Sequence, residues 1–345
     1  MKRPTQQDVA KRAGVSRATV SYVLNGLTDG YVTITEETRE KVMRAVVELG
    51  YQPDATAQSL RSGTTNTIGL LIPDMHNPHY WQIASGVESE LQTRGYDVLL
   101  MSASLNPERE LHSVQTLSRR RIDGLILLLT YYDHLRHELE ALVRQRKPLA
   151  LIGTSASTVD IARTSYKAGA VAVMKHLLEL GHRRIGLIYG GSLVYPEQGT
   201  DRLVAYRQGL QSAGIAADDD LIQYCGTTID EGYKAASTLL GLATPPTAII
   251  TINDMLAIGA MRAIDERQLA IPADISVASF DDIAMSAYLN PPLTTVHIDA
   301  EELGRAATRL IFRRLQNPDL PPQETFVPGH LIIRQTTDVP KGRTP

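Results

Sequence analysis

The chain has 345 residues, of which 43% are hydrophobic, and a formal net charge of -3. This length allows two or three domains, and the lack of an apolar run of about 18 residues excludes a membrane-spanning helix. Cys225 is the single cysteine, which excludes an internal disulfide framework and a cysteine-based zinc site. The N-terminus has no apolar segment of a secretory signal, so we expect a cytoplasmic protein.

The charge is unevenly distributed along the chain. Residues 1–25 have a net charge of +4, from Lys2, Arg3, Lys11, Arg12 and Arg17 against Asp8. A basic segment on an acidic chain favours an anionic partner, although a solvated basic surface has the same composition.

The first 26 residues predict two short helices joined by a turn at Gly14. The first covers about residues 6–12, and the second begins after Ser16, which is its N-cap. This is the helix-turn-helix arrangement, whose second helix enters the major groove of DNA by its N-terminus. We therefore expect Arg17 and Ala18 to lie nearest the bases.

The spacing of apolar residues predicts which face of the second helix is exposed. Val20, Val23 and Leu24 recur at helical spacing and point inward, so that Arg17, Ala18 and Tyr22 point outward. A third helix follows from Thr35, its N-cap, to residue 49, and Gly50 ends it. An accessory three-helix bundle without nucleic acid is the alternative interpretation of these three helices.

Residues 51–63 predict a short helix that forms only against a partner. Pro53 is typical of a helix start and Gly63 of a helix end, which leaves about two turns, too few for stability in water. Leu60 is the largest apolar side chain on this helix, and an exposed leucine suits a wedge in the minor groove. A flexible linker is the alternative.

Seven segments resemble, in order, the landmarks of the LacI family of bacterial transcriptional regulators, and the resemblance extends from residue 5 to about 337. These segments are TQQDVAKRAGVSRATVSYVLNG, TREKVMRAVVELGYQPDATAQSLRSG, IGLLIPDMHNPHYWQIASGVE, DGLILL, HLLELGHRRIGLIYG, IITINDMLAIGAMRAI and SFDDIAMSAYLNPPLTTV. The resemblance implies a repressor that binds a pseudo-palindromic operator as a homodimer and responds to a small-molecule effector, with no cofactor and no membrane contact.

The candidate DNA contacts combine the helix-turn-helix interpretation with this resemblance. They are Thr5, Gln7, Ser16, Arg17, Ala18, Thr19, Ser21, Tyr22, Asn25, Ala57 and Leu60. Lys2, Arg3, Ser16 and Thr19 are expected to hold phosphates. Many relatives carry arginine where this chain has Tyr22, which makes Arg17 the candidate for a forked contact with guanine.

From residue 66 onward, apolar runs alternate with helical stretches, and the pattern restarts near Tyr166. This predicts two α/β subdomains with parallel sheets, a type I periplasmic-binding-protein-like fold. The expected domains are 1–52 for DNA binding, 53–65 for the hinge helix and linker, and 66–345 for effector binding and dimerisation. The N-subdomain is placed at about 66–163 and 294–325, and the C-subdomain at about 164–293 and 326–340.

Aromatic and polar side chains follow the predicted strands, where ligands bind in such folds. The candidate effector contacts are His79, Tyr80, Tyr132, Arg202, Asn253 and Asp281, and aromatic rings with Arg, Asn and Asp favour a sugar. The resemblance implies effector contacts at all of these positions except Tyr132. Tyr80 and Trp81 are alternatively core residues at a helix start, and Asn253, Asp254 and Asp282 are alternatively helix caps.

Two positions depart from the family pattern. Gly153-Thr154 and Ser165-Tyr166 stand where relatives often carry charged residues, so the effector's identity does not follow from the resemblance.

Two other classes of protein fit the sequence less well. A sugar-binding protein without a DNA-binding role would not need residues 1–63. An enzyme would need a nucleophile, metal cluster or phosphate loop, and the sequence has no such motif. The end of the chain has no leucine heptad for a tetramer, which favours a dimer.

Overall fold

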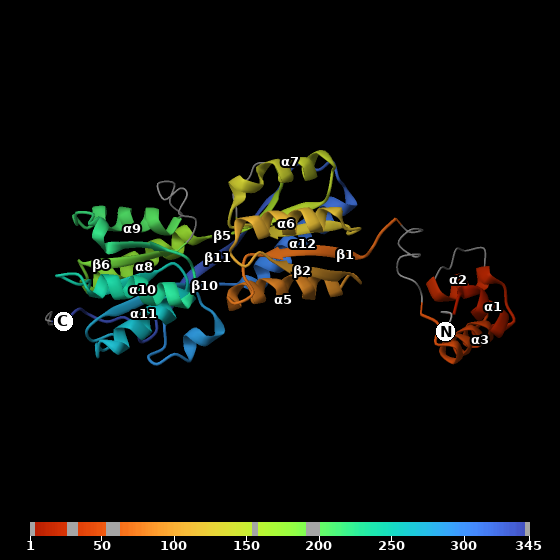
Figure 1. The fold of residues 1–345 in the computed structure, drawn as a ribbon, viewed down its shortest axis with the longest axis horizontal. Helices are drawn as coiled ribbons and strands as arrows, with labels where there is room; N and C mark the ends of the chain where they lie inside the picture. The colour runs from red at the N-terminus through yellow and green to blue at the C-terminus, as the bar shows by residue number, and fades with distance from the viewer. Residues whose placement is uncertain (1–3, 26–33, 53–62, 154–157, 191–200, 342–345) are drawn as a thin grey trace. The chain divides into compact units, whose positions relative to one another are not determined.

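The structure is a computed structural model that describes residues 4–25, 34–52, 63–153, 158–190 and 201–341. The chain forms two compact units, Met1–Thr65 and Asn66–Pro345. Figure 1 draws the segments outside the described ranges as a thin grey trace. The predicted hinge helix, with Ala57 and Leu60, lies outside the described residues. No helix in the described ranges is long and apolar enough to span a membrane.

The described residues of the first unit form three helices around a small core. They are α1 (Gln6–Ala13), α2 (Arg17–Asn25) and α3 (Glu36–Leu49). Val9, Val20 and Val42, one from each helix, are fully buried and pack in one cluster. The inward face predicted for α2 therefore lies in the core of this unit, together with residues of α1 and α3.

The predicted helix ends are confirmed by their hydrogen bonds. The Ser16 hydroxyl accepts a 3.0 Å hydrogen bond from the Thr19 amide, and the Thr35 hydroxyl accepts one of 3.3 Å from the Thr38 amide. Gly14 and Gly50 follow α1 and α3 in the left-handed conformation, with φ of 67° and 59°. Such caps satisfy amide and carbonyl groups that a helix end leaves unpaired.

The described residues of the second unit form eleven strands. The strands are β1 (Thr67–Ile72), β2 (Asp97–Ser102), β3 (Gly124–Leu128), β4 (Leu149–Ile152), β5 (Asp160–Ser165), β6 (Ile185–Gly190), β7 (Ile222–Cys225), β8 (Ala248–Thr251), β9 (Ser276–Asp281), β10 (Thr294–Ile298) and β11 (Glu324–Ile332). Their order is β2-β1-β3-β4-β5-β11-β10-β9-β8-β6-β7. All neighbours are parallel except β10 and β11, which are antiparallel.

Helices cover both halves of this strand array, as Figure 1 shows. The first half carries α5 (Pro78–Gln92), α6 (Pro107–Arg119), α7 (Arg136–Arg144) and α12 (Ala300–Gln316); the second carries α8 (Tyr166–Leu180), α9 (Asp201–Ser212), α10 (Ile229–Leu240) and α11 (Asp254–Glu266). Short 3-10 helices cover Tyr132–Leu135, Asp219–Leu221 and Ala284–Ala287. The apolar strands are buried beneath these helices, which confirms the prediction of two α/β halves.

Helices α5 and α12 approach each other closely because glycines face the partner backbone. A Cβ atom added to Gly86 would lie 1.9 Å from the Glu301 carbonyl oxygen, and one added to Gly304 would lie 2.1 Å from the Ile83 carbonyl oxygen. Neither distance leaves room for a methyl group. The two glycines therefore set the spacing of this helix pair.

Strand β11 joins the two halves. Its residues 324–328 pair with β5, and residues 329–332 pair with β10. Strand β10 in turn pairs with β9 in the second half. The chain thus returns to the first half after Ile298, whereas the sequence placed this crossing at about 294.

Candidate DNA-binding surface and effector site

Helix α2 presents the predicted recognition face. Arg17 and Ala18 are exposed, Tyr22 is half-buried, and Val20 and Val23 are buried. Within the described part of the first unit, no ion pair holds Arg17. Its charge is therefore available to an anionic or hydrogen-bonding partner.

The other candidate DNA contacts in the described part of the first unit are either helix caps or side chains that are at least partly exposed. Thr5 and Asp8 form a reciprocal capping box, in which the Asp8 carboxylate accepts hydrogen bonds of 2.8 Å from the Thr5 amide and 2.7 Å from its hydroxyl. Gln7 is exposed, and Thr19 and Ser21 are half-buried. Asn25 ends α2, and its side chain lies outside the described residues.

Arg202 is the centre of the candidate effector site. It lies in the first turn of α9, and its guanidinium carbon is 3.4 Å from the centroid of the Tyr166 ring and 4.9 Å from that of Phe280. An Arg202 Nη atom is 3.9 Å from a carboxylate oxygen of Asp281, and both side chains are largely buried. The cation is therefore held by two aromatic faces and one carboxylate.

Two buried nitrogen atoms of the candidate effector residues have no hydrogen-bond partner among the described residues. They are Nε of Arg202 and Nδ1 of His79. A buried polar atom without a partner costs about 1–3 kcal/mol. A ligand with hydroxyl groups would supply the missing partners.

The tyrosines of the site remain hydrogen-bond donors at neutral pH. Burial raises the pKa of Tyr80, and the negative charge of Asp281 raises it further. Burial also raises the pKa of Tyr166 to about 12, although the Arg202 charge opposes this shift. Tyr80 comes from α5 in the first half, whereas Tyr166, Arg202 and Asp281 belong to the second.

Asn253 has a structural role that the sequence also allowed. Its side-chain oxygen accepts a 2.8 Å hydrogen bond from the Leu256 amide and so caps α11. Its side-chain nitrogen donates to the Thr227 carbonyl at 3.3 Å. A ligand would therefore share this amide with the protein.

Asp254 is buried and ties three segments together. Its carboxylate accepts hydrogen bonds from the Ile283 amide at 2.9 Å, the Ser286 hydroxyl at 2.6 Å and the Thr295 hydroxyl at 2.8 Å. Burial, followed by repulsion from Asp281, raises its pKa to about 7. Asp254 thus holds the start of α11 to the segments that contain Ile283, Ser286 and Thr295.

The backbone turns sharply after β9. Asp281 and Asp282 have positive φ angles of 103° and 54°, which residues other than glycine rarely adopt. Asp282 pairs with His297 at 2.9 Å and with Arg334 at 2.7 Å. The alternative that Asp282 caps the next helix is wrong, because the N-cap of that 3-10 helix is Ile283, whose own side chain makes no capping hydrogen bond.

The other candidates differ in where they lie. His79 is buried beside Tyr80, with ring centroids 5.9 Å apart. Tyr132 packs against the core cluster under β3 and β4 rather than beside Arg202. Trp81 is 42% exposed and donates to the Met75 carbonyl at 2.8 Å, so its interpretation as a core residue is wrong.

Sequence reasoning missed Tyr166 and Phe280 as members of the site. In the sequence, Tyr166 marks only the restart of the α/β pattern and a departure from the family pattern, and Phe280 belongs to an apolar strand. An aromatic residue directly before Asp281 was the available signal. Among the described residues, no group of three His, Cys, Asp or Glu side chains could hold a metal ion.

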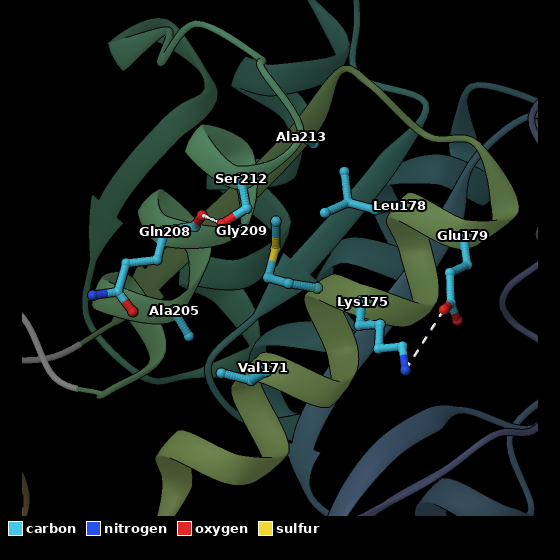
Figure 2. Close-up of a pocket in the computed structure, with 10 residues that line it drawn as sticks. Val171, Lys175, Leu178, Glu179, Ala205, Gln208, Gly209, Ser212 and Ala213 are labelled. Atoms are coloured by element: carbon cyan, nitrogen blue, oxygen red, sulfur yellow. Dashed lines mark hydrogen bonds and ion pairs between the residues drawn. The ribbon is translucent and has the colours of Figure 1, made fainter.

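A groove of about 470 Å³ lies apart from this site, between α8 and α9. It is lined mainly by apolar side chains, including Val171, Met174 and Leu178, with a Lys175–Glu179 pair at 3.7 Å on its rim (Figure 2). None of the candidate effector residues lines it.

The fold and site define a class of protein: a helix-turn-helix unit joined to a periplasmic-binding-protein-like unit. Residues 5–54 match the model for bacterial regulatory proteins of the lacI family, and residues 174–337 match a periplasmic binding protein-like domain. The chain is 34% identical to the ribose operon repressor of Haemophilus influenzae over 318 residues, which cover 91% of this chain and 93% of that protein.

Two solved structures are similar over most of their length. The Lac repressor dimer bound to operator and the anti-inducer ONPF has a TM-score of 0.86 at 29% identity, covering 98% of this chain and 100% of that one. A LacI family regulator from Enterococcus faecium with bound ribose has a TM-score of 0.69 at 29% identity, covering 79% and 99%. The chain belongs to the LacI family. It is a DNA-binding transcriptional regulator and not an enzyme.

Proposed function

We propose that this protein represses transcription by binding a pseudo-palindromic operator as a homodimer, under the control of a sugar bound between the two α/β halves. The observation that carries the effector assignment is the buried Arg202, stacked on Tyr166 beside Asp281 with its Nε unpaired. It supports a ligand that both accepts and donates hydrogen bonds. The protein would act in the cytoplasm, at the nucleoid.

The head would read DNA through α2. Arg17 would place its guanidinium on a guanine, and Ala18 would face a thymine methyl group or leave space. Tyr22 would contribute an apolar ring and a hydroxyl. Ser16 and Thr19 would face phosphates, and contacts from Thr5, Gln7, Ser21 and Asn25 would complete the half-site. Symmetry places one such head on each half of the operator.

The effector would be a neutral polyol. Arg202 and Asp281 have opposite charges, so together they favour a ligand without net charge. The hydroxyl groups of a sugar would accept from Arg202 Nε and pair with His79 Nδ1, and they would donate to Asp281. The ribose-bound relative supports this class of ligand. Tyr80 and Asn253 are proposed as further contacts.

The effector would act by changing the relative orientation of the two halves. A ligand that contacts Tyr80 from the first half and Arg202 from the second favours one orientation over the other. The change would reach the head through residues 53–65, where Ala57 and Leu60 are proposed to contact the minor groove. Coupling of this kind alters DNA affinity by the same factor as it alters effector affinity.

Two experiments test this proposal. Selection of full-length protein against random duplex DNA should yield a two-fold symmetric site, and failure to enrich any sequence would contradict operator binding. A thermal-shift panel of mono- and oligosaccharides, including ribose, should give a sugar whose effect Asp281→Ala removes. Lack of any shift across the panel would contradict a sugar effector.

A further inference from the structure

Three consecutive arginines form an exposed cationic surface on the second unit. Arg119 ends α6, and Arg120 and Arg121 follow it before β3. All three are exposed, and within the described ranges no ion pair involves any of them. We call Arg119–Arg121 the arginine patch.

The neighbouring cations at the same edge of the sheet are engaged in pairs. Arg94, Arg144 and Arg146 pair with Glu90, Glu140 and Asp319 at 3.0, 3.7 and 3.3 Å. Lys147 donates to the Ile122 carbonyl, and burial lowers its pKa. The arginine patch therefore differs from its surroundings, in which charges are offset.

The patch lies where the chain from the first unit enters the sheet. Asp123, two residues after Arg121, accepts a 2.9 Å hydrogen bond from the Asn66 amide, and its own amide donates to the Thr67 carbonyl at 2.8 Å. Strand β1 then pairs with β3, with Ile68 opposite Gly124. Asn66 also accepts from the Asp97 amide at 2.8 Å, so the entry point is fixed on both sides.

Covalent geometry limits the distance between this entry point and bound DNA. Fourteen residue steps separate Gln52 from Asn66, which at full extension span at most about 50 Å. Duplex DNA presents a phosphate charge about every 1.7 Å of its axis. The entry point at Asn66, and the patch beside it, are therefore tethered at a limited distance from the first unit, which is proposed to hold the DNA.

Stability of the fold does not explain three adjacent arginines. One cation in the last turn of α6 suffices to complement the helix dipole, a contribution of about 0.3–1 kcal/mol that falls off within one turn. Further like charges beside it repel each other. Arginine is well suited to phosphate because its planar fork donates two parallel hydrogen bonds.

We propose that the arginine patch contacts phosphates of the DNA bound by the first unit. This inference rests on the proposed operator binding and adds a sequence-independent contact from the effector-binding unit. Because the patch belongs to the half that carries Tyr80, a change in the orientation of that half would alter these contacts directly. The effector would then have a second route to DNA affinity.

The test compares two triple variants of the full-length protein with the same net charge. R119Q/R120Q/R121Q removes the patch, and K167Q/R207Q/K234Q removes three exposed cations of α8, α9 and α10 that form no ion pair in the described ranges. Affinity is measured by fluorescence anisotropy from about 50 to 300 mM KCl, on the selected operator and on a duplex of about 40 base pairs with arbitrary sequence.

The patch variant should have a salt slope shallower by at least about two units, one for each protomer of a dimer, and should lose affinity for both duplexes by a similar factor. The control variant should keep the wild-type slope. R119K/R120K/R121K should recover most of the slope because it restores the charge. Equal slopes for the patch and control variants would overturn the inference, as would dissociation of the patch variant to monomers.

Failure of the inference is distinguishable from failure of the proposed function. If wild-type protein binds neither duplex at about 50 mM KCl, operator binding itself is contradicted. If wild type binds both duplexes and the patch variant matches the control, the head binds DNA without the patch.

Discussion

The guanidinium carbon of Arg202 lies over the Tyr166 ring, 3.4 Å from its centroid. The contact orients Arg202 before any effector arrives. Asp281, 3.9 Å away, provides the only ion pair of Arg202 among the described residues. The ring is thus a positioning element for the arginine.

Replacing Tyr166 by alanine should weaken effector binding. Loss of a cation–π contact worth about 0.5–2 kcal/mol corresponds to a decrease in affinity of about 2- to 30-fold. Tyr166→Phe keeps the ring and should remain close to wild type. Isothermal titration with the most stabilising sugar of the panel measures both, and equal losses for the two variants would show that the ring face is not what matters.

The pKa of Asp254 predicts how stability depends on pH. Burial raises this pKa to about 7 in the folded state, whereas an unfolded aspartate titrates near its ordinary value of about 3.9. Between these values the folded state holds a proton that the unfolded state has lost. The contribution of Asp254 to stability is therefore present below about pH 4 and is lost as the pH rises to about 7.

The comparison of wild type with Asp254→Asn isolates this contribution. Trp81 is the single tryptophan and lies in the second unit, so its fluorescence reports denaturant unfolding of that unit. The free energy of unfolding should fall more steeply with pH in wild type than in the variant, by up to about 1.4 kcal/mol per pH unit between pH 5 and 7. Parallel pH profiles would mean that Asp254 is ionised throughout this range.

Much of the fold was predictable from the spacing of apolar residues. Helices α2 and α3 of the first unit follow from caps at Ser16 and Thr35, and the apolar runs after residue 66 correspond to β1–β4, β6, β8 and β9. Strands β5 and β11 carry no such signal. Strand β11 contains Pro328 and Gly329, which disfavour a strand, and it forms only because β5 and β10 supply partners.

Of the residues around Arg202, the sequence predicted the charged ones and not the aromatic rings that contact them. Arg202 and Asp281 stand after predicted strands, where ligand contacts gather. The aromatic environment was not predictable, because Tyr166 and Phe280 are distant from Arg202 in sequence and local patterns contain no information about that contact. The orphaned atoms of His79 and Arg202 likewise appear only once the chain has folded.

The glycine pair between α5 and α12 predicts a sharp stability effect. In Gly304→Ala the new methyl group would meet the Ile83 carbonyl oxygen at 2.1 Å, and backbone cannot move aside as a side chain can. We expect a loss of about 2 kcal/mol or more in the free energy of unfolding. Gly241→Ala is the control, because its Cβ would lie 3.4 Å from the nearest atom and its φ of -85° suits alanine. Similar stabilities for the two variants would contradict the close approach of α5 and α12.

Arg17 should determine the operator sequence more than any other described side chain of the head. It is exposed at the N-terminal end of α2, beside the Ser16 cap. Arg17→Ala should weaken binding to the selected operator by about 1–3 kcal/mol and relax the preference at one base pair in each half-site.

Lys11→Gln is the control for Arg17→Ala, because it also removes one positive charge. Lys11 is exposed and lies on α1, outside the recognition helix. This variant should weaken binding to all sequences about equally and leave the base preferences unchanged. Repeating the selection from random DNA with both variants measures the two effects together. If the Arg17 variant selects the wild-type site with no position relaxed, then Arg17 contacts the backbone, and the guanine contact must come from another residue of α2.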